Sequence, residues 1–119
     1  MSAIAATSLE MIRGDTALIN GAVKTGSSVF DLSGATVKFT ARQNINDVMP
    51  LFQKTTGGSG ITVTNAAQGE LTIEIAPADT ASLTNESSLF VWDLEVTRGG
   101  QVFTVAHGDL RVTLDVTRS

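Results

Sequence analysis

The stretch LFVWDLEVT–RGGQ–VFTV, residues 89–105, carries the strongest fold signal in the sequence. Side chains alternate between the two faces of a β-strand, so one face of residues 89–97 is apolar and the other is charged. The Gly99-Gly100 pair supplies the positive φ that a tight hairpin turn requires. A hairpin with one apolar face must pack that face on a second sheet. The stretch therefore predicts two strands of a β-sandwich.

The same alternation recurs along the chain, interrupted by turns rich in Gly, Asp and Ser. In the second strand we expect Leu18 and Val23 to point inward. Pro50 has no backbone N–H, which predicts an edge strand around it, and one helical turn over residues 78–83 is expected to be capped by Asp79 or Thr80. The pattern predicts an all-β sandwich of seven to nine short, mostly antiparallel strands. The expected strands are residues 8–12, 16–24, 35–42, 48–54, 61–64, 71–75, 89–97, 102–105 and 110–116.

Length and composition restrict the function classes. The chain has 119 residues, enough for one domain with its own core. Its 8 basic and 12 acidic residues give a net charge of −4, which argues against nucleic acid as a partner. The absence of cysteine excludes a disulfide framework and a cysteine nucleophile. No apolar run approaches the roughly 18 residues of a membrane-spanning helix, and the first residues do not form a signal-peptide pattern. We expect a protein made in a cytoplasm, with no membrane partner.

The chain divides into an N-terminal arm, residues 1–8, and a sandwich domain, residues 9–119. The arm is small and largely apolar, without regular alternation. Either it contacts a neighbouring subunit, as an assembly arm would, or it is a loose tail with no role. The candidate arm residues are Met1, Ser2, Ala3, Ile4, Ala5 and Ala6. Inward positions of separate strands should meet in the core between the sheets. The predicted core residues are Phe39, Ile73, Phe90, Trp92, Leu94 and Val112.

The order of several short motifs resembles that of a known family. These motifs are IRGDT (12–16), FDLSGATVKFT (30–40), LFQKT (51–55), IAPADTA (75–81), WDLEV (92–96), GDLRV (108–112) and DVTR (115–118). Together they resemble the small immunoglobulin-like domain of tailed-bacteriophage structural proteins, similar to the N-terminal domain of baseplate upper proteins. The resemblance spans roughly residues 9–118.

The resemblance implies a single immunoglobulin-like β-sandwich that works as a virion structural protein of the tail, baseplate or neck. It implies a multicopy assembly or adaptor module, homo-oligomeric in the particle, whose partners are other phage structural proteins. The expected location is the virion, after synthesis in the host cytoplasm. It carries over no catalytic residue, cofactor or metal site. The alternatives are a head-decoration protein and a carbohydrate- or receptor-binding module, which should display exposed aromatic rings.

Three motifs invite sharper interpretations. The Arg13-Gly14-Asp15 triplet matches an adhesive motif, but such triplets recur by chance, and we expect a turn whose glycine takes the positive φ. His107 shares the outward face of the last strand with Asp109 and Arg111, a set too small for most metal sites. Asp93 and Glu95 share an outward face as a glycosidase pair would, but surface carboxylates more often protect a sheet from edge pairing. We therefore expect no enzyme.

Overall fold

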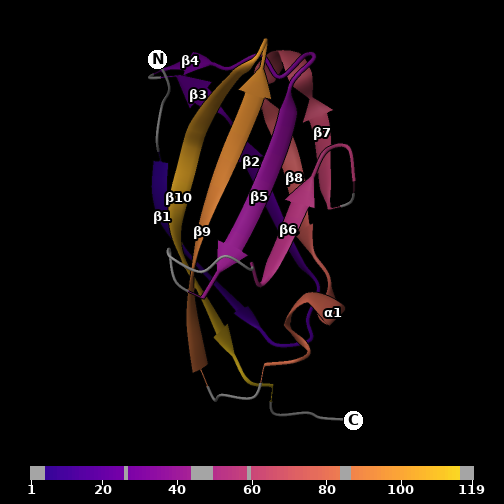
Figure 1. Ribbon diagram of the computed structural model, residues 1–119, viewed down its shortest axis with the longest axis vertical. Coiled ribbons are helices and arrows are strands. Elements are labelled where there is room, and N and C mark those ends of the chain that lie inside the picture. Colours follow the sequence, from indigo (N-terminus) through magenta and orange to yellow (C-terminus); the bar gives the residue numbers. More distant parts are fainter. Residues whose placement is uncertain (1–4, 26, 44–49, 59, 84–86, 116–119) are drawn as a thin grey trace.

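Two β-sheets face each other in the computed structural model, which describes residues 5–25, 27–43, 50–58, 60–83 and 87–115 (Figure 1). The five-stranded sheet has the order β1-β10-β9-β5-β6, and the three-stranded sheet has the order β2-β8-β7. The five strands are β1 (Ala5–Ile12), β10 (Gln101–Thr113), β9 (Ser87–Arg98), β5 (Thr36–Arg42) and β6 (Phe52–Thr55). The three are β2 (Ala17–Ala22), β8 (Glu70–Ile75) and β7 (Ile61–Asn65). The remaining elements are the small hairpin of β3 (Lys24–Thr25) and β4 (Ser28–Val29), the 3₁₀ turn Ala66–Gln68 and helix α1 (Pro77–Thr80).

The strand order is that of an immunoglobulin-like sandwich. Strands β2, β8 and β7 stand in the order B-E-D of that fold, and β10, β9 and β5 in the order G-F-C. All pairings between these strands are antiparallel except that of β1 with β10, which is parallel. The predicted all-β, immunoglobulin-like sandwich is confirmed. Two strands are longer than expected, because β9 and β10 run for 12 and 13 residues as one continuous hairpin.

The hairpin turn has the geometry expected from its two glycines. Gly99 and Gly100 have φ values of 60° and 81°, and Arg98 lies opposite Gln101. Both turn residues are therefore left-handed, as a two-residue hairpin loop requires. The ladder shifts register between Thr104 and Ala106, a bulge that the sequence pattern did not predict. Beyond the bulge, Leu110 and Val112 point into the sandwich, as expected.

All six predicted core residues belong to one cluster of buried side chains between the two sheets, each with at most 7% of its surface exposed. The rings of Phe39 and Trp92 lie 5.4 Å apart, and those of Phe39 and Phe52 lie 6.0 Å apart. The Trp92 Nε1–H donates a hydrogen bond to the carbonyl oxygen of Asp109, 3.1 Å away. The indole is thus buried with its polar atom satisfied, which fixes its orientation.

The boundary between arm and domain lies earlier than the sequence predicted. Strand β1 begins at Ala5 and not near residue 8, and Ala5 and Ala6 pair with Ala106 and His107. The sandwich domain therefore starts at Ala5, and these two residues are not part of a free arm. Backbone hydrogen bonds to β10 hold this segment, and such bonds leave no trace in the side-chain pattern. The other candidate arm residues, 1–4, lie outside the described residues.

Two smaller expectations were right only in part: Val23 but not Leu18 points inward, and the helical turn forms with Asp79 capping it from its third position rather than as the N-cap. Leu18 points outward with 64% of its surface exposed, because Ile19 lies opposite Ile73 and its own side chain takes the inward position; Val23 is buried as expected. Helix α1 ends at Thr80, and its N-cap is Ala76, whose backbone N–H donates to the Asp79 carboxylate at 2.7 Å. No helix among the described residues is long and apolar enough to cross a membrane.

Strand β6 is an edge strand, as the proline at position 50 predicted, but it begins at Phe52 and not at residue 48. The residues just before Pro50 lie outside the described ones. Gly34, with φ 74°, forms the predicted corner, where Ser33 donates its N–H to Asp31 at 2.8 Å. This hydrogen bond, together with one from the Ser33 side chain, lowers the pKa of Asp31.

Candidate functional site

The sandwich has two long sides, and each exposes one edge strand from each sheet. Strands β6 and β7 end their sheets on one side, and β1 and β2 end them on the other. An edge strand presents unpaired backbone N–H and C=O groups, which makes it a template for another strand. The two sides differ in how they treat these edges.

The side formed by β6 and β7 is closed by contacts between the sheets. Lys54 of β6 is only 8% exposed, and its Nζ lies 2.6 Å from the carboxylate of Asp79 in α1. Its ammonium also lies 5.8 Å from the centre of the Phe52 ring. An isolated bridge joins Thr55 to Gly60, at the start of β7. The ion pair thus ties β6 to α1, which follows β8, and the bridge joins the end of β6 to the residue before β7. We call this the closed side.

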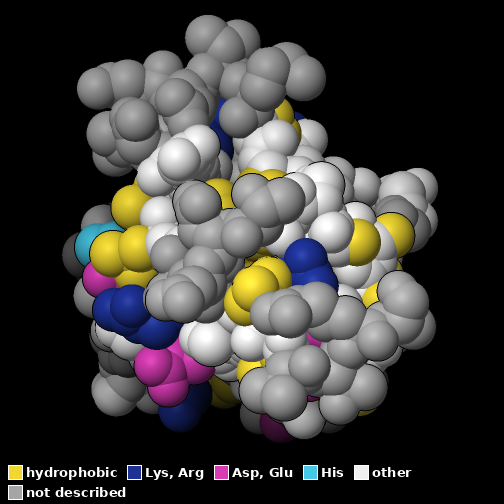
Figure 2. Space-filling view, turned by 90° about the horizontal axis from the view of Figure 1, so that it is seen from below, with side chains coloured by type: hydrophobic (Ala, Val, Ile, Leu, Met, Phe, Trp, Pro, Cys, Tyr) yellow, Lys and Arg dark blue, Asp and Glu magenta, His cyan; other side chains and the backbone are white. Residues whose placement is uncertain are grey.

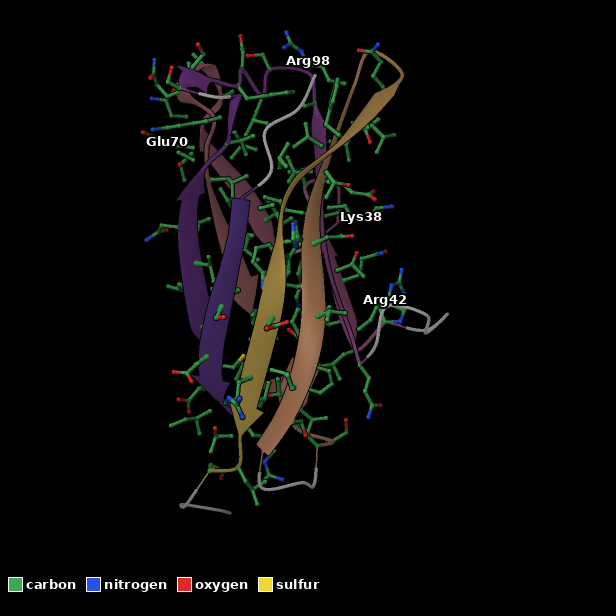
Figure 3. The ribbon with its side chains drawn as sticks, turned by 90° about the vertical axis from the view of Figure 1, so that its left-hand side faces the viewer. Lys38, Arg42, Glu70 and Arg98 are labelled. Atoms are coloured by element: carbon green, nitrogen blue, oxygen red, sulfur yellow. The ribbon has the colours of Figure 1, made fainter. Side chains whose placement is uncertain are left out.

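The side formed by β1 and β2 is joined at one end by the turn of residues 13–16, but among the described contacts no ion pair spans the two strands, and a groove runs between them. Figure 3 views this side, with β1 and β2 next to each other. The groove has a volume of about 360 Å³. Its lining is mostly apolar, with Glu10 and Asn20 as its two polar side chains. We call this the open side. The apolar residues of its lining are Leu9, Met11, Ala17, Leu18, Ile19, Ile75 and Leu110.

The edge of β2 lacks the devices that protect the other edges. Its sequence, ALINGA, contains no charged residue and no proline. By contrast, β1 carries Glu10, β6 carries Lys54 and is preceded by Pro50, and β7 has a register shift between Val63 and Asn65. Charges, prolines and bulges on edge strands prevent pairing with other chains. Among the described edge strands, β2 is therefore the one best suited to accept another strand.

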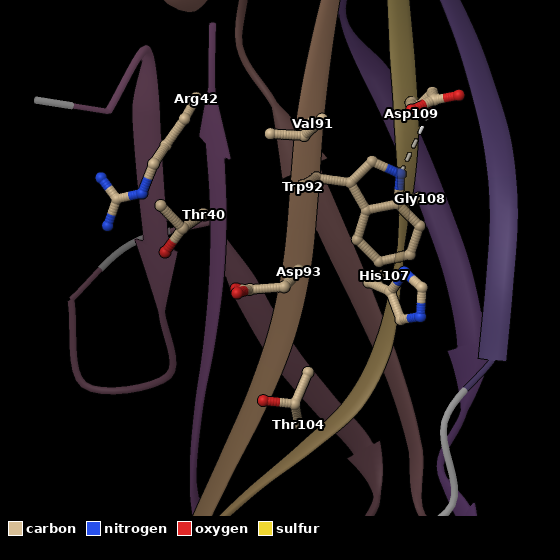
Figure 4. A pocket seen from close by; sticks show the side chains of 9 residues that line it. All are labelled: Thr40, Arg42, Val91, Trp92, Asp93, Thr104, His107, Gly108 and Asp109. Atoms are coloured by element: carbon tan, nitrogen blue, oxygen red, sulfur yellow. Dashed lines mark hydrogen bonds between the residues drawn. The ribbon is translucent and has the colours of Figure 1, made fainter. Parts of the chain in front are cut away.

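A second candidate lies on the outer face of the five-stranded sheet, where a shallow hollow of about 360 Å³ opens between β5, β9 and β10 (Figure 4). Asp93 lies there, directly opposite His107 on one side and Thr40 on the other. Burial raises the pKa of Asp93, and the nearby charge of Glu95 adds to this, while Arg42 and His107 lower it. Thr40 points to this outer face, yet it is buried and accepts a hydrogen bond from Gln53 at 3.0 Å.

The hollow does not assemble a recognisable catalytic or metal centre. His107, Asp109 and Arg111 share the outward face, as expected, and all three are exposed. Among the described residues, no group of three or more His, Asp or Glu side chains is placed to hold a metal ion. The carboxylates Asp93 and Glu95 occupy successive outward positions of β9, paired with His107 and Thr104. A perturbed carboxylate alone is a weak sign of function, because structural clusters produce the same shift.

The Arg13-Gly14-Asp15 triplet is a structural turn at the lower end of the domain. The Arg13 guanidinium lies 2.7 Å from the Asp115 carboxylate and donates to the Leu83 carbonyl oxygen at 2.9 Å. Gly14 has φ 83°, and its N–H donates to Thr80 Oγ1 at 2.9 Å. Seen from below, this end places positive and negative side chains beside one another (Figure 2). The Arg13 guanidinium is thus bound within the fold, whereas an adhesive motif needs this cation available to a receptor.

Comparisons with known proteins add little beyond the fold. No protein-family model matches the sequence, and no curated protein matches it significantly. A solved structure of murine CRIg is similar with a TM-score of 0.43 and 12% identity, over 91% of this chain and 92% of that one. A sialyltransferase from Photobacterium damsela is similar with a TM-score of 0.40 and 8% identity, over 96% of this chain. The chain spans only 18% of the length of that enzyme.

Proposed function

We propose that this protein is a virion structural protein of a tailed bacteriophage, placed in the tail, baseplate or neck, where it acts as a multicopy assembly module. The observation that carries the assembly role is the open side, where the unprotected edge of β2 borders an apolar groove. An added strand there gains backbone hydrogen bonds and covers apolar surface at once. The phage setting is supported by the order of sequence motifs described above. The partners are other structural proteins of the particle, and the protein is made in the host cytoplasm.

An assembly role fits the chemistry of the surface better than catalysis does. Leu18 is the most exposed of the large apolar side chains on the described surface, and it lies at the rim of the groove. The polar lining of the outer-face hollow includes Asp93, His107 and Thr104, but no described hydrogen bond there joins a hydroxyl nucleophile to a base and an orienting group. Burial of an apolar groove against a neighbour needs none of these. Binding without chemistry is therefore the function that the geometry supports.

A head-decoration protein is the same physical proposal at another position in the particle. A carbohydrate-binding module needs an aromatic ring on the surface for sugars to stack on. All six aromatic residues of the chain lie in its described part, and none is exposed; Trp92 is only 7% exposed. This observation favours the assembly role over the sugar-binding one.

The proposal is tested by finding the protein in particles. Purified virions of the phage that encodes it should contain the chain in multiple copies, measured by quantitative mass spectrometry. Antibody labelling under the electron microscope should place it on the tail, baseplate or neck. Labelling of the head would move it to the decoration alternative. Absence of the chain from purified particles would overturn the proposal.

A further inference from the structure

We propose that two copies of this protein pair through β2, antiparallel about a twofold axis at Asn20, so that the two three-stranded sheets become one six-stranded sheet. The inference deepens the proposed assembly role and names the partner as a second copy of the chain. It begins from the fact that β2 ends its sheet with β8 as its one described neighbour in the ladder. A six-stranded sheet lies within the usual size of sheets in globular proteins.

The composition of β2 allows a second copy as the partner. The strand carries no charge, so two copies meet along it without placing like charges opposite each other, although each chain has a net charge of −4. The nearest acidic side chains in this sheet are Glu70 and Glu74 on β8. In the pair, the two β8 strands would stand three strand spacings apart, about 14 Å. That distance exceeds the Debye length of about 8 Å at physiological salt, so their repulsion is screened.

The alternation of side chains restricts the register. Residues directly opposite each other across a sheet must point to the same face. With Asn20 opposite Asn20 of the second copy, Leu18 lies opposite Ala22 of that copy on the outer face. On the inner face, Ile19 lies opposite Gly21 of the second copy.

This register matches polar with polar and apolar with apolar. An asparagine amide both donates and accepts hydrogen bonds, so two of them complement each other across a twofold axis. Thr72 of β8 donates to the Asn20 side-chain oxygen at 2.8 Å, which holds that oxygen in place on the outer face. If the twofold axis lay at Ile19 instead, Leu18 would lie opposite Asn20 of the second copy, an apolar side chain opposite a polar one.

Pairing would also bury what the open side now exposes. Leu18, 64% exposed, would be covered by the added strand. The groove between β1 and β2 would lie under the new neighbour, whose Ile19 points to the same inner face. The backbone hydrogen bonds and the apolar contacts therefore act together at one place.

The absence of cysteine allows a direct test by disulfide trapping, because each variant then has a single thiol. In the proposed pair, Asn20→Cys places the two thiols directly opposite each other, at a Cα separation that a disulfide spans. Leu18→Cys is the matched control, on the same strand and face, more exposed, but about 14 Å from its own copy. Under mild oxidation we expect Asn20→Cys to form covalent dimers at least about tenfold faster, because pairing raises the local thiol concentration to the millimolar range. Thr62→Cys, on the edge strand β7, should behave like Leu18→Cys.

Sedimentation of the unmodified protein gives a second, independent readout. We expect its mass to rise with concentration from 12.4 kDa toward twice that value, and Asn20→Lys to remain at 12.4 kDa because it places two cations face to face. Equal cross-linking of all three cysteine variants, together with a mass of 12.4 kDa at every concentration, would overturn the pairing. Faster cross-linking of Leu18→Cys would overturn the Asn20 axis. A protein that is present in particles but never pairs would refute this inference alone, and one that pairs but is absent from particles would refute the proposed function alone.

Discussion

The closed and open sides show two ways in which one sandwich can treat its sheet edges. On the closed side, the partly buried pair of Lys54 and Asp79 ties β6 to α1, and a bridge joins Thr55 to Gly60 just before β7. On the open side, the contact described at the edge of β1 is a long, exposed ion pair between Glu10 and Arg111, at 4.0 Å. Contacts that stabilise the domain therefore lie on the closed side, while the open side leaves an edge strand that another strand could join.

The largest expected effect is loss of the closed-side ion pair. Lys54→Ala leaves the Asp79 carboxylate partly buried without its cation, which should cost about 3 kcal/mol in the free energy of unfolding. The matched change on the open side, Glu10→Gln, should cost less than about 0.5 kcal/mol because both partners are exposed. Urea denaturation of the two variants measures both values. Equal costs would show that the two sides do not differ as described.

A pair of glycine substitutions sharpens the same contrast. Gly60 has φ 97°, and an added Cβ would lie 2.4 Å from Cδ of Lys54, so Gly60→Ala should destabilise the fold by about 1–3 kcal/mol. Gly21 in β2 has no atom within 4 Å of an added Cβ and no positive φ. Gly21→Ala should therefore stabilise the fold by about 0.5 kcal/mol through the unfolded chain. Thermal unfolding measures both signs, and destabilisation by Gly21→Ala would mean that the open edge is tightly packed.

Truncation tests how far the open side extends along β1. Deleting Ser2–Ile4 leaves β1 intact and should not change the melting temperature. Deleting Ser2–Ala6 also removes the pairings of Ala5 and Ala6 with β10, which should cost about 1–2 kcal/mol. Calorimetry compares the two truncated proteins. Equal melting temperatures would return Ala5 and Ala6 to the arm.

The smallest expected effect is a pH-dependent change in stability at Asp93, in the outer-face hollow that is the alternative candidate site to the open side. The raised pKa of Asp93 means that the folded state binds a proton more tightly than the unfolded one, so the wild type loses stability as the pH rises from 3.8 through the folded pKa. Asp93→Asn removes this loss, so it should raise the melting temperature at pH 7, with a gain that disappears below pH 3.8. Asp31→Asn is the control of opposite sign, because a lowered pKa stabilises the fold above pH 3.8. Assembly should be unchanged by Asp93→Asn; its loss would make the outer face the functional surface.

Side-chain periodicity made the core and the sandwich predictable. Trp92 and Leu94 lie on the apolar face of a regular strand. The Gly99-Gly100 turn was predictable because a tight hairpin turn requires positive φ at both positions, which glycine adopts readily. The pairing of Ala5 with Ala106 was not predictable, because backbone hydrogen bonds carry no side-chain signal. The inward prediction for Leu18 was wrong because Ile19, paired with Ile73 of β8, takes the inward position and turns Leu18 to the outer face.

The open side could be found from sequence only in part. The uncharged run of β2 is a visible signal for an unprotected edge, but it gains meaning only when β2 is known to end its sheet. The closed-side pair of Lys54 and Asp79 joins residues far apart in the chain, and no local pattern announces it. His107, Asp109 and Arg111 were placed on one face correctly, because alternation alone determines that.

Incorporation into particles tests whether the edge of β2 serves assembly, as we propose. Asn20→Lys and Thr62→Lys each add one lysine to an exposed outward position on an edge strand of the same sheet, on the open and closed sides respectively. With melting temperatures shown to match, we expect Asn20→Lys to reduce the copies per particle severalfold and Thr62→Lys to leave them at the wild-type level. Equal incorporation of the two variants would contradict the account.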